Sequence, residues 1–202
     1  MRRRLFLIGV TVAGAPARAA AFARSADVWR LLRGGGHVIL MRHAATVPGI
    51  GDPPGFALAQ CSTQRNLSQA GRADARKIGQ ALQAHGIPLA AVLSSRWCRC
   101  LDTARLAFGR VEPAPMLDSM FRDAADAGAQ KVRQVRAYLG MLKAAGNTVL
   151  VTHDVNIRAL VGQSVAQGEM VVAAVEPGGA LRVVALLRPG PDGLSISASP
   201  PP

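Results

Sequence analysis

The sequence has few aromatic residues and no long apolar run. Phe, Trp and Tyr together make up 4% of the 202 residues, so a row of aromatic side chains on which nucleic-acid bases could stack is not expected. No apolar run reaches the roughly 20 residues that a membrane-spanning helix needs. The chain is nevertheless basic, with 24 Lys and Arg against 12 Asp and Glu. Because the arginines are spread along the chain, we expect this charge to attract small anionic ligands rather than nucleic acid.

Cysteine is also scarce, with three residues at positions 61, 98 and 100. Cys98 and Cys100 are two apart in a predicted helix, where their side chains lie on different sides, so a bond between them is disfavoured. In an exported protein we expect Cys61 to pair with Cys98 or Cys100; three buried, reduced cysteines are the alternative. The C-x-C spacing is poor for zinc and no histidine is spaced to complete a site, so we predict no metal and no other cofactor.

The first 23 residues have the order of a secretory signal peptide, in which basic residues precede an apolar run and small residues. Arginines at positions 2–4 are followed by the apolar run Leu5–Ala15. We expect export, to a bacterial periplasm, and a mature N-terminus between Ala20 and Arg24 that N-terminal sequencing of the native protein would check. The segment also resembles a twin-arginine leader, with an ordinary basic start as the alternative. Four of the 24 basic residues lie in it, which leaves 20 basic and 12 acidic residues and a net charge of +8.

Residues 24–190 are predicted to form one domain, followed by a Pro-rich tail without regular structure at 191–202. Short apolar runs typical of buried strands alternate with segments of helical period. The runs lie at 37–41, 90–93 and 148–152, the helical segments at 68–85, 97–108, 130–145 and 156–165, and a hairpin at 171–187. This alternation predicts an α/β protein with three layers, α/β/α, and a mostly parallel central sheet.

Two of the predicted strands are followed directly by histidine-containing pairs. The strand at 37–41 runs into Arg42 and His43, and the strand at 148–152 runs into His153. Ligands in open α/β sheets lie outside the carboxyl ends of the strands, so we expect the two histidines to face one site. The arginine beside His43 indicates that the ligand is an anion.

These motifs resemble those of the histidine phosphatase superfamily, which also contains the cofactor-dependent phosphoglycerate mutases. The family's motifs fall, in order, on Arg42-His43, Leu67–Gly71, the Ser-Ser-x-x-x-Arg-x-x-x-Thr-Ala run of Ser94–Ala104 with its arginine at Arg99, and His153. The resemblance covers roughly residues 36 to 175. It implies a phosphoglycerate mutase-like fold and phosphoryl transfer through a phosphohistidine.

Physical chemistry is consistent with the roles that the resemblance implies. Arginine forks bind phosphate oxygens bidentately, so Arg42 and Arg99 are predicted to clamp the phosphate. A neutral imidazole can attack phosphorus, and the residue fixed directly after Arg42 is His43, to which we assign the attack. His153 is predicted to donate a hydrogen bond to a non-bridging oxygen.

The chain departs from the family at the proton donor. The mutases and their nearest relatives have a glutamate downstream of the second arginine, whereas residues 115–123 contain none. Instead, His153 is followed by Asp154, which resembles the His-Asp motif of the acid phosphatase and phytase branch, where the aspartate protonates the leaving group. Asp154 is therefore the predicted general acid. Asp118 and Asp123 are the reserve candidates, with solvated loop carboxylates as their alternative.

Residues outside these motifs are assigned to substrate contact, packing or structural roles. Arg65 and Thr46, near the two ends of the Gly- and Pro-rich loop, are predicted to contact the substrate, with a surface role as the alternative for Arg65. Trp97 is assigned to packing, and His37 and His85 to structural roles. Ala44 replaces the glycine that usually follows the family's first histidine, a change that we expect the site to tolerate.

The resemblance therefore implies an exported, metal-independent phosphomonoesterase that takes a small-molecule or glycolipid phosphomonoester. Its nearest pattern is a small bacterial exported branch, which includes phosphatases proposed to act on sugar phosphates of the cell envelope. A mutase is the enzyme alternative, disfavoured by export and by the missing glutamate. A catalytically silent phosphosugar-binding protein is the other alternative, disfavoured because binding alone does not need two imidazoles.

Overall fold

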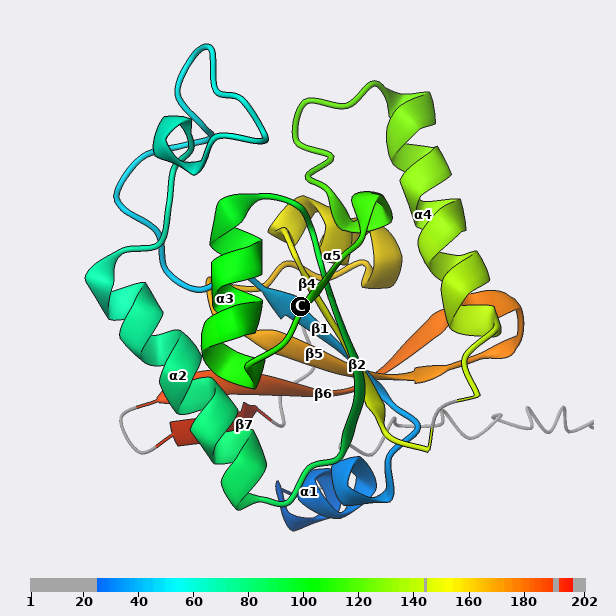
Figure 1. Cartoon of the computed structure of the whole chain (residues 1–202). Coiled ribbons are helices and arrows are strands. Elements are labelled where there is room, and N and C mark those ends of the chain that lie inside the picture. Colours follow the sequence, from blue (N-terminus) through cyan, green and yellow to red (C-terminus); the bar gives the residue numbers. More distant parts are fainter. Residues whose placement is uncertain (1–24, 144, 191–192, 198–202) are drawn as a thin grey trace, which may run out of the picture.

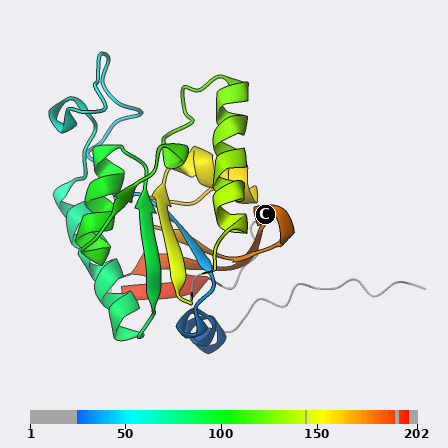
Figure 2. The ribbon, with the colours of Figure 1, turned by 45° about the vertical axis from the view of Figure 1, so that its right-hand side comes forward.

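The computed structural model describes residues 25–143, 145–190 and 193–197, in which one sheet lies between two layers of helices (Figures 1 and 2). The strands are β1 Val38–Arg42, β2 Leu89–Ser94, β3 Glu112–Pro113, β4 Asn147–Thr152, β5 Met170–Val175, β6 Leu181–Gly190 and β7 Gly193–Ser197. Their order in the sheet is β3-β2-β4-β1-β5-β6-β7. The predicted α/β fold with three layers is confirmed.

The sheet is mixed. Strands β3, β2, β4 and β1 are parallel neighbours, whereas β5, β6 and β7 join them in antiparallel pairs. The sequence predicted a mostly parallel sheet, and this holds for the half of the sheet that contains β1 and β4, the strands that precede His43 and His153. The other half is built by hairpins, which need no crossover helix and therefore leave no helical segment in the sequence.

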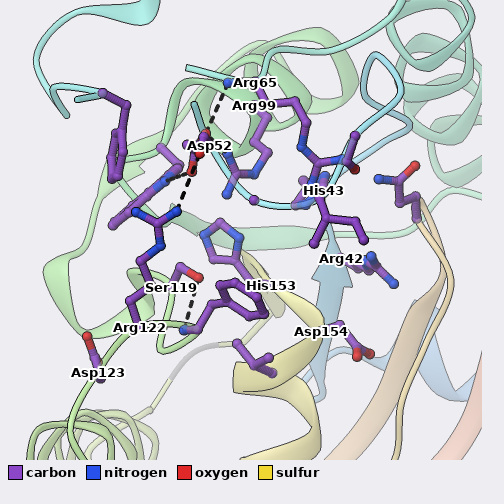
Figure 3. Close-up of a pocket in the computed structure, with 18 residues that line it drawn as sticks. Arg42, His43, Asp52, Arg65, Arg99, Ser119, Arg122, Asp123, His153 and Asp154 are labelled. Atoms are coloured by element: carbon purple, nitrogen blue, oxygen red, sulfur yellow. Dashed lines mark hydrogen bonds and ion pairs between the residues drawn. The ribbon is translucent and has the colours of Figure 1, made fainter. Parts of the chain in front are cut away.

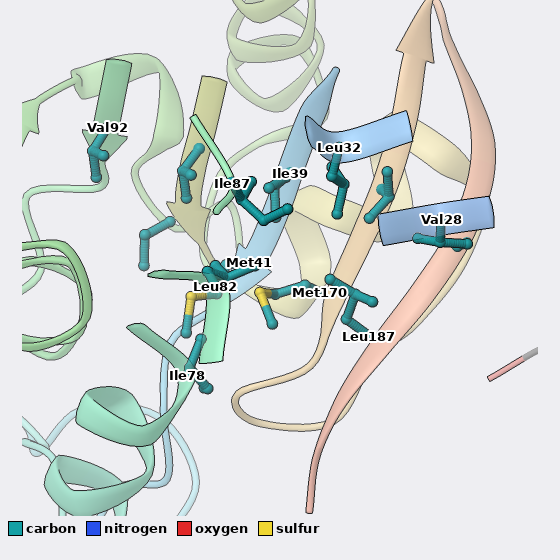
Figure 4. Close-up of a cluster of buried hydrophobic side chains, with 14 of the residues drawn as sticks. Val28, Leu32, Ile39, Met41, Ile78, Leu82, Ile87, Val92, Met170 and Leu187 are labelled. Atoms are coloured by element: carbon teal, nitrogen blue, oxygen red, sulfur yellow. The ribbon is translucent and has the colours of Figure 1, made fainter. Parts of the chain in front are cut away.

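Strands β1 and β4 are central because their side chains are apolar on both faces. Successive side chains of a strand point to opposite faces, so Ile39 and Met41 pack on one side of the sheet and Val38 and Leu40 on the other. All four are fully buried. Figure 4 shows the first of these two clusters, in which Ile39 and Met41 meet side chains of the covering helices.

The helices cover both faces of the sheet. On the face of Ile39 and Met41 lie α1 Ser25–Gly34, α2 Gln69–Ala84 and α3 Cys98–Phe108. On the opposite face lie α4 Ala125–Gly140 and α5 Asp154–Val161. None of the helices that the structure describes is long and apolar enough to cross a membrane.

Three expectations about segment boundaries need correction. Helix α4 begins and ends about five residues earlier than its apolar period indicated, since the Ala-rich stretch at 125–129 forms its first turn. Helix α5 begins at Asp154, directly after His153, and ends at Gly162 in the left-handed conformation. Within the segment expected to lack regular structure, residues 193–197 form strand β7 on the edge of β6. The predicted signal peptide lies outside the described residues.

Candidate active site

The carboxyl ends of the parallel strands open into a cavity of about 460 Å³. The loop between β1 and α2 covers this edge of the sheet, as Figure 1 shows above α3. Arg42, His43, Arg99 and His153 all line the cavity, together with Arg65 and Asp154. The structure therefore brings every residue that the sequence predicted for the site, apart from Thr46, to one cavity (Figure 3).

His43 lies at the end of β1 with one ring nitrogen held by its own chain. Its Nδ1 is 2.9 Å from the carbonyl oxygen of Ala44. A carbonyl can only accept, so Nδ1 carries the proton and Nε2 has the free lone pair in the neutral ring. Burial, together with the smaller effects of the Arg99 and Arg42 charges, lowers the pKa of His43 to about 3, although the hydrogen bond to Ala44 raises it. His43 is therefore a neutral imidazole at physiological pH, as a nucleophile must be.

His153, at the end of β4, lies beside His43, with ring centroids 5.5 Å apart and the rings edge to face. Its Nε2 is 2.9 Å from Oγ of Ser95, the second serine of the Ser-Ser motif. Burial lowers the pKa of His153 well below its usual value, and the neighbouring His43 and Arg99 add to this shift. Both rings are thus neutral, and the serine at the end of β2 orients the second one.

Arginine side chains surround the two imidazoles. Arg99 is 4% exposed, and the Nε groups of Arg42, Arg65 and Arg99 are buried without a hydrogen-bond partner in the structure. Arg42, Arg65 and Arg99 all line the same cavity, and this concentration of guanidinium groups indicates a site made for an oxyanion. The lowered pKa of Arg65, caused by burial and by the nearby Arg99 charge, reflects the same concentration of positive charge.

Arg42 and Asp154 are linked through the backbone of Val165. Nη1 of Arg42 donates to the Val165 carbonyl at 2.7 Å, and the Val165 amide donates to Oδ1 of Asp154 at 2.8 Å. The backbone N–H and C=O of Val165, in the loop before β5, therefore connect the predicted phosphate clamp to the predicted general acid. Through its hydrogen bond to Val165, Asp154 helps to hold the Arg42 side chain in position.

Asp52 was not predicted from the sequence, yet it has the most partners in the cavity. Its carboxylate accepts hydrogen bonds from Arg99 Nη1 at 2.7 Å, Trp97 Nε1 at 2.9 Å and the Arg65 amide at 3.0 Å. Burial raises the pKa of Asp52, but these hydrogen bonds and the Arg99 charge outweigh it and lower the pKa below its usual value. A lone carboxylate in a Gly- and Pro-rich loop has no pattern that would single it out.

A disulfide fastens the loop to the helix that carries Arg99. Cys61 pairs with Cys98, the first residue of α3, with the Cα atoms 5.6 Å apart. The Cys98 amide also donates to Oε1 of Gln64 at 3.0 Å. Of the two pairings that the sequence left open, the structure has the one with Cys98. Cys100 is free and buried, and burial raises the pKa of its thiol to about 12.

Thr46 does not line the cavity, which corrects the prediction that it contacts the substrate directly. Its hydroxyl oxygen accepts a hydrogen bond from Nε2 of Gln167 at 3.1 Å, and Gln167 is the residue that lines the cavity. Thr46 also forms an isolated bridge with Leu67. The loop that carries Thr46 does line the cavity, through residues such as Asp52 and Arg65. The orientation of the Thr46 side chain itself could not be predicted, because residues of an irregular loop have no periodic orientation.

The reserve carboxylates are occupied elsewhere. Asp118 is buried and bonded to the backbone amide and the guanidinium of Arg96, and it does not line the cavity. Asp123 lines the cavity at its rim and forms an ion pair with Lys131 at 2.7 Å. Asp118 therefore holds the turn after β2 in place.

The remaining motif residues hold the segment after His43 against two helices. Ser68 caps α2, accepting from the Gly71 amide at 3.0 Å, and the Ser68 amide donates to Ala45. A side chain at Gly71 would collide with the Ala45 carbonyl, so glycine is required by this close approach. The Ala44 amide donates to Oγ1 of Thr103 at 3.0 Å.

Ala44 fits its position, as expected. Its side chain is fully buried in a small cluster with Leu67 and Ala75. No non-glycine residue among those described has a positive φ, so the backbone at Ala44 does not need the freedom of the glycine usual in the family.

Within residues 25–143, 145–190 and 193–197, no three His, Cys, Asp or Glu side chains are grouped so that they could hold a metal ion. The groups present are a neutral imidazole with a free lone pair, a second imidazole beside it, and several guanidinium donors. This set can neutralise a dianion and attack it with nitrogen. It is suited to phosphoryl transfer.

Solved structures of known proteins share this fold. An α-ribazole phosphatase from Shigella flexneri has a TM-score of 0.53 at 20% identity, over 73% of this chain and 95% of that chain. A phosphoserine phosphatase from Entamoeba histolytica in complex with 3-phosphoglyceric acid has a TM-score of 0.54 at 15% identity, over 74% and 95%. The protein histidine phosphatase SixA complexed with tungstate has a TM-score of 0.51 at 14% identity, over 76% and 97%. At these identities the similarity concerns the fold alone.

No curated protein sequence matches the chain. A sequence profile of the histidine phosphatase superfamily, branch 1, matches residues 38–125. This range contains Arg42, His43 and Arg99, and the structure adds His153 to the same cavity. The fold and the order of these motifs agree with this match, so the chain is similar to the histidine phosphatase superfamily.

Proposed function

We propose that the protein is a phosphomonoesterase that works through a phosphohistidine on His43. The observation that carries this proposal is the neutral His43 ring, whose proton is on Nδ1, in a cavity that three arginines line. A phosphate-binding protein needs the arginine donors alone. A neutral imidazole whose Nε2 lone pair is free is in addition suited to nucleophilic attack on phosphorus.

In the proposed reaction the phosphate group of the ester enters between the arginines. Arg99 and Arg42 neutralise its non-bridging oxygens, and His153 donates to one of them from the ring nitrogen that does not face Ser95. Nε2 of His43 then attacks phosphorus in line with the leaving oxygen. Water hydrolyses the phosphohistidine in the second half-reaction, which regenerates His43. Positioning and charge neutralisation supply most of the rate enhancement in such transfers.

The substrate is proposed to be a small-molecule or glycolipid phosphomonoester, such as a sugar phosphate of the cell envelope. The walls of the cavity support a substrate with a sizeable leaving group, because Phe56, Trp97 and Phe121 line it together with Gly and Ser residues. Export to the periplasm accompanies this proposal and rests on the sequence of the first 23 residues. An oxidising compartment would also suit the Cys61–Cys98 disulfide.

A phosphatase panel on the purified protein tests the function. It should include p-nitrophenyl phosphate, a sugar phosphate, phosphoserine and a phosphohistidine peptide, each with and without chelator. We expect phosphate release from at least one of them, unchanged by chelator and inhibited by tungstate as a phosphate-like oxyanion. Absence of release across the panel would refute the proposal, as would activity that chelator abolishes and a divalent metal restores. Transfer of phosphate between positions of one sugar, without release, would instead indicate a mutase.

A further inference from the structure

The leaving group of the proposed reaction needs a proton, and the side of the cavity on which it departs follows from the position of His43. His43 comes directly after β1, so the phosphate lies beyond the end of that strand. In-line attack places the leaving oxygen on the far side of phosphorus, toward the loop between β1 and α2. In Figure 3, Asp52 lies above the two histidines on this side, whereas Asp154 lies below them.

We propose that Asp52 is the general acid of the phosphatase reaction, donating a proton to the leaving oxygen. This inference rests on the proposed function and replaces the assignment of that role to Asp154. Asp52 is bonded to Arg99 Nη1 at 2.7 Å, and Arg99 is the guanidinium proposed to hold the phosphate. One guanidinium group therefore lies in contact with both the carboxylate and the phosphate oxygens.

The other carboxylates that line the cavity are less well placed. Asp154 has Oδ1 bonded to the Val165 amide and, in Figure 3, lies below the two histidines, opposite to Asp52. Asp123 is paired with Lys131 at the rim. Of the three carboxylates that line the cavity, Asp52 is the one whose side chain is bonded to side chains of other cavity residues, namely Arg99 and Trp97. Its side chain is 7% exposed, which shields a transferred proton from water.

Substrate binding raises the pKa of Asp52, so that the carboxylate takes up the proton that the reaction needs. In the empty site the carboxylate is ionised, since Arg99, Trp97 and the Arg65 amide all stabilise its charge. Arg65 belongs to the same loop as Asp52, and Nη2 of Arg122 lies 3.5 Å from the Asp52 carbonyl oxygen. A bound phosphate dianion shares these cations and adds negative charge beside the carboxylate, both of which favour its protonation. Proton uptake is therefore coupled to binding.

As the His43 Nε2–phosphorus bond forms, the bond between phosphorus and the ester oxygen breaks, and Asp52 transfers its proton to that oxygen to release an alcohol. Water then attacks the phosphohistidine while the Asp52 carboxylate accepts its proton. The nitrogen–phosphorus bond breaks, and inorganic phosphate leaves with His43 neutral again. The proton taken up on binding returns to solvent when the phosphate departs.

The test compares two leaving groups in the full-length protein. Asp52→Asn keeps the size of the side chain and an oxygen acceptor but cannot donate an acidic proton. General acid catalysis is worth roughly 10²–10⁴-fold, so we expect Asp52→Asn to reduce kcat on an alkyl or sugar phosphate at least about 100-fold. Nitrophenolate leaves without a proton, so the loss on p-nitrophenyl phosphate should stay below about 10-fold. Inhibition by tungstate should change by only a few-fold, since Arg99 remains.

Two further variants complete the experiment. Asp126→Asn removes an exposed carboxylate of α4 and should leave both activities unchanged. Asp154→Asn should lower both activities alike, because Asp154 acts through Val165 on Arg42. Equal losses on both substrates in Asp52→Asn would overturn the assignment in favour of positioning Arg99. A leaving-group-dependent loss in Asp154→Asn instead would return the role to Asp154. A wild type inactive on every substrate of the phosphatase panel would overturn the proposed function and this assignment with it.

Discussion

Replacing His43 by alanine is expected to abolish turnover and the covalent phosphoenzyme together. In the proposed reaction the ring contributes the attacking Nε2, and its Nδ1 is held by the Ala44 carbonyl, so removal of the ring removes the proposed nucleophile. Removal of a catalytic nucleophile costs enzymes about 10⁴-fold or more in kcat. A labelled phosphodonor, followed by a quench that avoids acid, should give an acid-labile phosphoprotein from the wild type and none from His43→Ala.

The matched control is His85→Ala. His85 stacks on Trp29 with ring centroids 3.8 Å apart and does not line the cavity, so this variant should retain both label and turnover. Tungstate should still protect His43→Ala against thermal unfolding, because the arginines remain. Label that persists on His43→Ala would assign the attack to a different residue, with His153 as the next candidate.

The second large effect expected is a loss of stability in acid. The pKa of His43 is lowered to about 3 and that of His153 well below its usual value, chiefly by burial. Below about pH 6.5 the unfolded chain binds protons at both rings, whereas the folded protein does not. The free energy of unfolding should therefore be fully present above this pH and fall as the pH decreases toward 3. Each ring contributes up to about 1.4 kcal/mol per pH unit.

Urea unfolding at pH 7 and at pH 4.5 measures this effect. Two rings together would remove several kcal/mol of a total that is typically about 5–15 kcal/mol. Asp52, whose pKa is lowered, adds to the loss only at the acid end of this range, below its unfolded value. His43→Asn should show a shallower decline than the wild type, because one of the two neutral rings is gone. An equal free energy of unfolding at both pH values would contradict the lowered histidine pKa values.

Local sequence patterns predicted much of the fold and the site residues at the ends of the parallel strands. The apolar runs before His43 and His153 are typical of buried strands, and neighbouring parallel strands bring their carboxyl ends to one edge. The Ser94–Ala104 motif begins at the end of a third such strand, which explains why Arg99 reaches the same cavity. The antiparallel half of the sheet was predicted only as far as its hairpin, because β7 lies in a Gly- and Pro-rich segment that resembles a tail.

The sequence by itself determined which residues end the strands, and with them the paired imidazoles and the arginine clamp. Only the tertiary structure decided which loop residues complete the site. Asp52 accepts a hydrogen bond from Arg99, Gln167 lines the cavity where Thr46 was expected, and Cys61 is paired with Cys98. The physical reason is that a strand end inherits its direction from a repeating backbone, whose period the sequence displays. A side chain in an irregular loop is oriented by hydrogen bonds and covalent bonds to residues far along the chain, and these partners are set only when the whole domain has packed.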